Sequence, residues 1–248
     1  MHGPQAWWRA LEPVELLQAA GRWTDASTIA RRVEAEQPPG AEGAPSRVVA
    51  AAVACGAELA EELAAGMSAK RLERLPTLVA AAKAAVREAE RAFPEATRNG
   101  WVRGTLDTVK ATAAVATLLL ARTVTDPAAD AATLDSAART LSTTPTVHAS
   151  GAYRKAIANA WKIAALLFRY DAAVREADPA SVTLLQAAQR RAHVLRSELP
   201  PGAPANLDRF LASMEAVTNP RAAEATWRLL ASVPPPIPIV GNSLIPQG

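Results

Sequence analysis

The best candidate for nucleophilic chemistry in the sequence is Ser68, in the stretch GMSAKR at residues 66–71. Hydrolases that activate a serine with a lysine place the lysine three positions after the serine, one helical turn along the chain. Arg71 occupies that position here, and a guanidinium stays protonated, so it cannot accept the serine proton. We therefore predict that Ser68 caps the helix that follows it and has no catalytic role.

The histidines and acidic residues form no recognisable metal or paired-carboxylate motif. His2, His148 and His193 are far apart in the sequence and belong to no His-Glu-x-x-His or Glu-x-x-His pattern. Asp126 and Asp130 are close together, but they stand where a helix is predicted to begin, and capping and the helix dipole favour acids there. The sequence also has no glycine-rich phosphate loop. We therefore predict no metal, no cofactor and no enzymatic activity.

The composition favours helices throughout. Half of the 248 residues are apolar and only 4% are aromatic. Alanine dominates, and it is the strongest helix former. The larger aliphatic residues recur at helical rather than alternating spacing. We predict an all-α fold, a multi-helix bundle of about ten helices followed by a proline-rich extended C-terminal tail.

Pairs of a capping residue and proline mark several helix starts, as at Asp126-Pro127 and Asp178-Pro179. The predicted helices cover residues 12–20, 25–36, 46–65, 68–92, 101–123, 127–141, 151–177, 179–198, 204–217 and 220–232. We divide the chain into an N-terminal helical hairpin and linker (1–45), a helical bundle body (46–232) and an extended docking tail (233–248).

The N-terminal hairpin resembles a single tetratricopeptide repeat over residues 12–38. The positions that carry the resemblance are Gly21, Ala26, Ala30, Val33 and Pro38. Such repeats need about three copies to bury their faces, and the sequence has no second copy. We therefore predict one generic helical hairpin.

A basic ridge supports an alternative function, a DNA-binding regulator that uses residues 134–169. The stretch from Leu134 to Trp161 resembles a helix-turn-helix, whose second helix must present basic or amide side chains to the major groove. Lys155, Lys162 and Arg169 recur every seven residues. The candidate nucleic-acid contacts are Arg154, Lys155, Lys162, Arg169, Arg190 and Arg191.

The C-terminal stretch PPPIPIVGNSLIPQG, residues 234–248, is the main candidate for partner binding. Prolines keep it extended, which lowers the entropy lost when it binds a groove or a sheet edge. Exposed aliphatic side chains cost about 1.5–3 kcal/mol each relative to full burial, so a burial site is expected, either on another protein or in a groove of the chain's own helical body. The candidate anchors are Ile237, Ile239, Val240, Leu244 and Ile245.

Residues 239–244 of this tail, IVGNSL, resemble the targeting peptides of encapsulin cargo proteins. The resemblance implies that Ile239, Val240 and Leu244 bind the inner surface of a protein shell and that the helical body is cargo. Our leading hypothesis is a non-catalytic interaction protein that docks through residues 234–248 onto another protein, a neighbouring copy or an assembly such as a shell or phage particle.

The remaining features favour a cytoplasmic protein. Cys55 is the only cysteine, so the chain has no disulfide framework and fits a reducing compartment. The first residues lack the pattern of a secretory signal. The longest apolar stretch, residues 111–121, is shorter than the ~20 residues of a membrane-spanning helix, so we expect no membrane partner.

Overall fold

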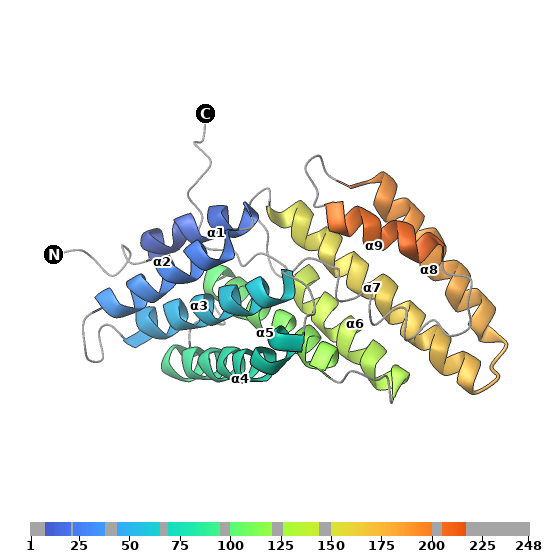
Figure 1. Ribbon diagram of the computed structural model, residues 1–248, viewed down its shortest axis with the longest axis horizontal. Helices are drawn as coiled ribbons and strands as arrows, with labels where there is room; N and C mark the ends of the chain where they lie inside the picture. Colours follow the sequence, from blue (N-terminus) through green and yellow to red (C-terminus); the bar gives the residue numbers. More distant parts are fainter. Residues whose placement is uncertain are drawn as a thin grey trace.

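The computed structural model describes residues 8–20, 22–37, 44–64, 69–94, 100–120, 126–143, 150–199 and 205–216. The described elements are all helices, with no strand among them (Figure 1). They are the 3₁₀ helix η1 (Trp8–Leu11) and the α-helices α1 (Glu12–Ala19), α2 (Trp23–Glu36), α3 (Ala44–Ala64), α4 (Ala69–Ala92), α5 (Gly100–Leu120), α6 (Pro127–Thr143), α7 (Ser150–Arg175), α8 (Ala180–Ser197) and α9 (Ala205–Glu215).

The all-α prediction is confirmed over these residues. The observed ends of α1 to α9 fall within three residues of the predicted ends. The predicted helix at 220–232 and the tail at 233–248 lie outside the described residues. Among the described helices, none combines the length and the apolar character that a membrane span requires.

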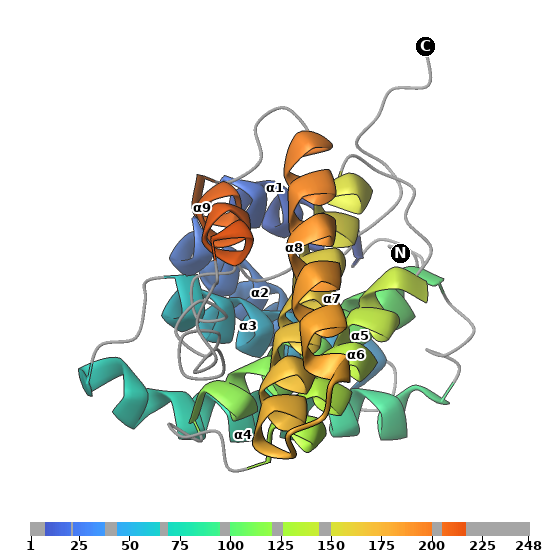
Figure 2. The ribbon, with the colours of Figure 1, turned by 90° about the vertical axis from the view of Figure 1, so that its right-hand side faces the viewer.

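The helices pack mainly against their neighbours in chain order. Each α-helix contacts the next one, and further contacts join α3 to α5 and α7 to α9. The first helices therefore lie at one end of the long axis, and α8 and α9 lie at the other (Figure 1). Viewed from that second end, α8 lies in front of α7 (Figure 2).

Helix α3 has two buried faces. One face packs on α2 and contributes Val53 and Ala57 to a small apolar cluster that also includes residues of η1 and α1. The other face contributes Leu59 and Leu63 to a larger cluster that extends as far as α9. Six of the eight residues at positions 50–57 of α3 are alanine or glycine, and small side chains let helices approach closely on both sides. Helix α3 therefore joins the N-terminal hairpin to the rest of the molecule.

Acidic side chains accept hydrogen bonds from backbone amides in the first turns of α6 and α8. The Ala129 amide donates a 3.0 Å hydrogen bond to Asp126 Oδ1 at the start of α6. The Ala180 amide donates a 2.8 Å bond to Asp178 Oδ1 before α8. These bonds satisfy amide groups that have no partner inside the helix, which explains why both helices begin where they do.

Candidate functional site

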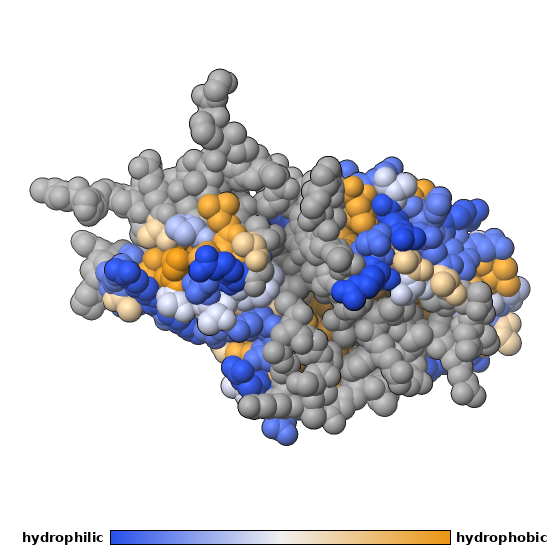
Figure 3. Space-filling model, turned by 45° about the horizontal axis from the view of Figure 1, so that its top comes forward, coloured by the Kyte–Doolittle hydropathy of each residue, from blue (hydrophilic) through white to orange (hydrophobic). Residues whose placement is uncertain are grey.

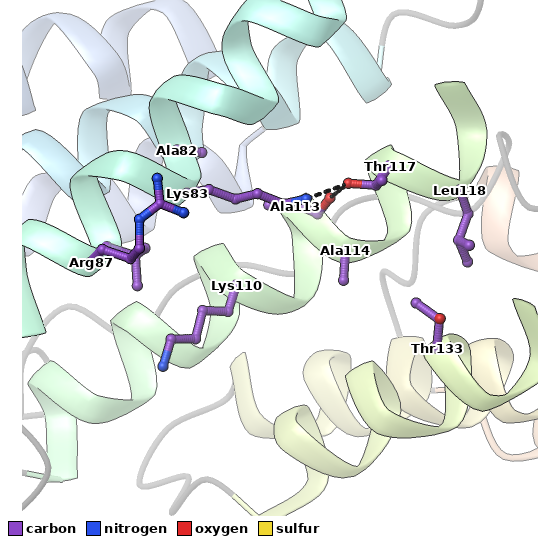
Figure 4. A pocket seen from close by; sticks show the side chains of 10 residues that line it. Ala82, Lys83, Arg87, Lys110, Ala113, Ala114, Thr117, Leu118 and Thr133 are labelled. Atoms are coloured by element: carbon purple, nitrogen blue, oxygen red, sulfur yellow. Dashed lines mark hydrogen bonds between the residues drawn. The ribbon is translucent and has the colours of Figure 1, made fainter. Parts of the chain in front are cut away.

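A pocket of about 360 Å³ lies between α4, α5 and α6 (Figure 4). Its floor includes Ala82, Val86 and Ala113, each at most 2% exposed. Its rim carries the exposed cationic side chains Lys83, Arg87 and Lys110. We call this combination of apolar floor and basic rim the cationic pocket.

Helical spacing places these side chains together. Lys83 and Arg87 are four residues apart on α4, so they project from the same face of that helix. Lys110 and Ala114 have the same spacing on α5, and Thr133 comes from α6 (Figure 4). The pocket therefore depends on three helices that are separate in the sequence.

The rim has more positive charges than carboxylate partners. Lys110 pairs with Glu90. Lys83 Nζ donates a 2.9 Å hydrogen bond to the neutral Thr117 hydroxyl (Figure 4). Arg87 has no ion pair with any carboxylate of the described residues. The rim thus keeps an excess of positive charge above an apolar floor.

A second polar cluster connects α2 to α3. Arg31 forms two hydrogen bonds with Glu58, of 3.0 and 3.2 Å, and one of 3.0 Å with Glu34. Burial lowers the pKa of the Arg31 guanidinium, but the bonds to the two glutamates outweigh burial, and the pKa is raised. Arg31 Nη2 also lies 3.4 Å from Cys55 Sγ.

The surroundings of Cys55 disfavour its thiolate form. Burial raises the pKa of Cys55, and the nearby Arg31 charge only partly opposes that effect. The thiolate is the nucleophilic form of cysteine, and a raised pKa reduces its population at neutral pH. Together with the paired charges around Arg31, this indicates that the cluster holds α2 against α3.

Arg154, one of the candidate nucleic-acid contacts, is buried. Its side chain is 0% exposed, and Nη2 donates a 2.9 Å hydrogen bond to Thr108 Oγ1 on α5. The Thr108 hydroxyl in turn donates a 2.7 Å bond to the Gly104 carbonyl. Arg154 therefore joins α7 to α5 inside the fold, and its side chain is not at the surface where the prediction requires it.

Two of the other candidate nucleic-acid contacts interact with α6. Lys162 Nζ lies 3.4 Å from Ser142 Oγ, and Arg169 pairs with Asp135. Lys155 is exposed on α7, and Arg190 and Arg191 are exposed on α8. The exposed members Lys155, Arg190 and Arg191 thus lie on two different helices.

The tail anchors Ile237, Ile239, Val240, Leu244 and Ile245 lie outside the described residues, as does Ser68. Within the described part of the chain, no group of three or more histidine, cysteine, aspartate or glutamate side chains is arranged to hold a metal ion.

Comparison with known proteins gives no relative from which a site could be transferred. No family model matches the chain. No curated protein and no solved structure matches it significantly either.

Sequence reasoning missed the cationic pocket. Lys83, Arg87 and Lys110 are each set in alanine-rich or aliphatic segments, AAAKAAVRE and LDTVKATAA. Isolated basic residues on otherwise apolar helix faces were the available signal. That signal could not show which faces of α4, α5 and α6 meet.

Proposed function

We propose that the protein is a non-catalytic helical scaffold that docks through residues 234–248 onto another protein, a neighbouring copy or a larger assembly. The observation that carries this proposal is the packing of the helices in chain order along one axis. Helical proteins whose elements contact mainly their neighbours present extended surfaces to partners. This is the surface that a scaffold requires.

Exposed apolar side chains at the two ends of the molecule give further support. Leu16 on α1 is 58% exposed, and Val182 and Val194 on α8 are 61% and 51% exposed. Apolar surface is visible near both ends of the face drawn in Figure 3. Burial of such side chains by a partner stabilises the complex. The same holds for the aliphatic residues of the tail.

The proposal is tested by a variant that ends at Val233. We expect its helical circular dichroism and melting temperature to equal those of the full chain, while its association, measured by sedimentation and by capture of partners from the natural source, is lost. Two substitutions in the full chain, Ile239→Asp and Leu244→Asp, should have the same effect because each puts a charge at an expected anchor. Gln247→Ala is the control and should associate normally.

Two results would overturn the proposal. Undiminished association of the variant that ends at Val233 would exclude the tail as the docking segment. Unfolding of that variant would mean that the tail completes the protein's own core.

The described residues give the nucleic-acid alternative less support. Arg154 is buried, and Arg169 is neutralised by Asp135. An electrophoretic mobility assay at low salt, where contacts to phosphates are strongest, is expected to show no shift of duplex DNA. A shift that Lys155→Glu abolishes would restore the alternative.

A further inference from the structure

We propose that the cationic pocket binds a small amphipathic anion, an organic carboxylate with a compact apolar body. The carboxylate would lie among Lys83, Arg87 and Lys110, and the apolar body would cover Ala82, Val86 and Ala113. None of the residues that line this pocket belongs to residues 234–248, so the proposal does not depend on the scaffold function.

The size and lining of the pocket suit a small molecule. Its volume of about 360 Å³ lies at the low end of the range for small-molecule sites, ~300–1,000 Å³. Such sites are mostly apolar with a few polar groups that fix orientation. The apolar floor and the basic rim of the cationic pocket match that description.

The charges of the rim select an anion. Of the three cations, Lys110 alone has an ion pair with a carboxylate of the described residues, Glu90. The bond between Lys83 and Thr117 satisfies one ammonium hydrogen without neutralising the charge. A bound carboxylate would accept charge-assisted hydrogen bonds from Arg87 and Lys83, and such bonds are stronger than neutral ones.

The apolar floor is equally necessary for binding. The three cations are exposed, and ion pairs in contact with water contribute little, ~0–1 kcal/mol each. An inorganic anion would therefore bind weakly, and most of the affinity must come from apolar area that the ligand buries on the floor. A neutral apolar molecule would gain that area but leave the rim charges without a partner.

A phosphodiester chain is a poorer occupant than a small carboxylate. Its backbone has no apolar body to cover Val86 and Ala113. An acidic protein segment would extend beyond a pocket of this size.

The experiment measures binding of octanoate to the full chain by calorimetry and by amide chemical shifts. Two matched probes are used: acetate lacks the apolar body, and octanol lacks the charge. We expect saturable binding of octanoate, with shifts centred on α4, α5 and α6, and at least about tenfold weaker binding of acetate and octanol. Raising the ionic strength should weaken octanoate binding.

Variants then assign the rim and the floor. Arg87→Met and Lys110→Met keep an apolar stem but remove the charge, and each should weaken octanoate binding about threefold to tenfold. Ala114→Trp should abolish binding by filling the pocket. Arg91→Met is the control, because Arg91 lies on the same helix, pairs with Glu88 and does not line the pocket.

Three outcomes would overturn the proposal. They are no saturable binding of octanoate at millimolar concentration, equal binding of octanol and octanoate, and equal weakening by Arg87→Met and Arg91→Met. Melting temperatures of all variants show whether a loss of binding reflects a loss of folding, and the two charge variants test the site even if Ala114→Trp does not fold.

Discussion

Gln18 on α1 is the buried side chain whose replacement gives the clearest test of the packing. It is 2% exposed, and neither atom of its amide group has a hydrogen-bond partner among the described residues. A buried amide without partners loses its hydrogen bonds to water and forms none in the protein, which destabilises the folded state. We predict that Gln18→Leu raises the free energy of unfolding by about 1 kcal/mol, measured from the urea midpoint.

Gln37 provides the matched control for Gln18. Its amide nitrogen donates a 3.1 Å hydrogen bond to the Val33 carbonyl, and its amide oxygen accepts a 2.8 Å bond from Ser46. Gln37→Leu removes both bonds, so the free energy of unfolding should fall by about 1 kcal/mol. If Gln18→Leu lowers the stability as Gln37→Leu does, then the amide of Gln18 has a partner in solution and our interpretation is wrong.

Single residues also show what the sequence can and cannot predict. Asp126 was predictable as a cap because capping depends on the residue and the few positions after it, and its bond to Ala129 confirms this. Arg154 was not predictable, because its burial against Thr108 depends on how α7 meets α5. Local chemistry is visible in a sequence, whereas contacts between distant helices are not.

At the scale of elements, the close approach of α3 to α5 is set by Gly56. A Cβ atom at this position would lie 2.7 Å from Val109 Cγ2. Val109 is 1% exposed, and a valine in a helix has one strongly preferred rotamer, so it cannot move aside easily. We predict that Gly56→Ala destabilises the protein by about 1 kcal/mol, because overpacking outweighs the helix propensity that alanine gains.

The same substitution should have the opposite sign when Val109 is shortened. In a Val109→Ala background the nearest remaining atom is Cβ, at 3.7 Å, an ordinary contact. Gly56→Ala should then stabilise by about 1 kcal/mol, the propensity difference between the two residues. Equal effects in both backgrounds, measured by urea unfolding, would show that α3 and α5 are not in contact at this point.

The helices themselves were predictable because their ends carry local signals, whereas their packing was not. Capping residues and prolines fixed the start of α6, and the alanine-rich sequence fixed the helical class. The cationic pocket depends instead on the relative rotation of α4, α5 and α6, which isolated basic residues do not reveal. The fold class and helix ends therefore follow from the sequence, but the site does not.

At the scale of the whole molecule, packing in chain order predicts that local damage spreads only to neighbouring helices. Val33 belongs to the small cluster that η1, α1 and α2 share with α3, and Phe210 on α9 belongs to the larger cluster. Stacked helical proteins unfold in parts whose stabilities depend on adjacent elements.

We predict that Val33→Ala accelerates amide exchange in α1 and α2 but not in α8 and α9, and that Phe210→Ala does the reverse. Since α3 packs directly on α2, its exchange should also be accelerated by Val33→Ala. Equal acceleration of α2 and α9 by Val33→Ala would instead require a single cooperative unit, and would remove the structural basis that we give for an extended scaffold.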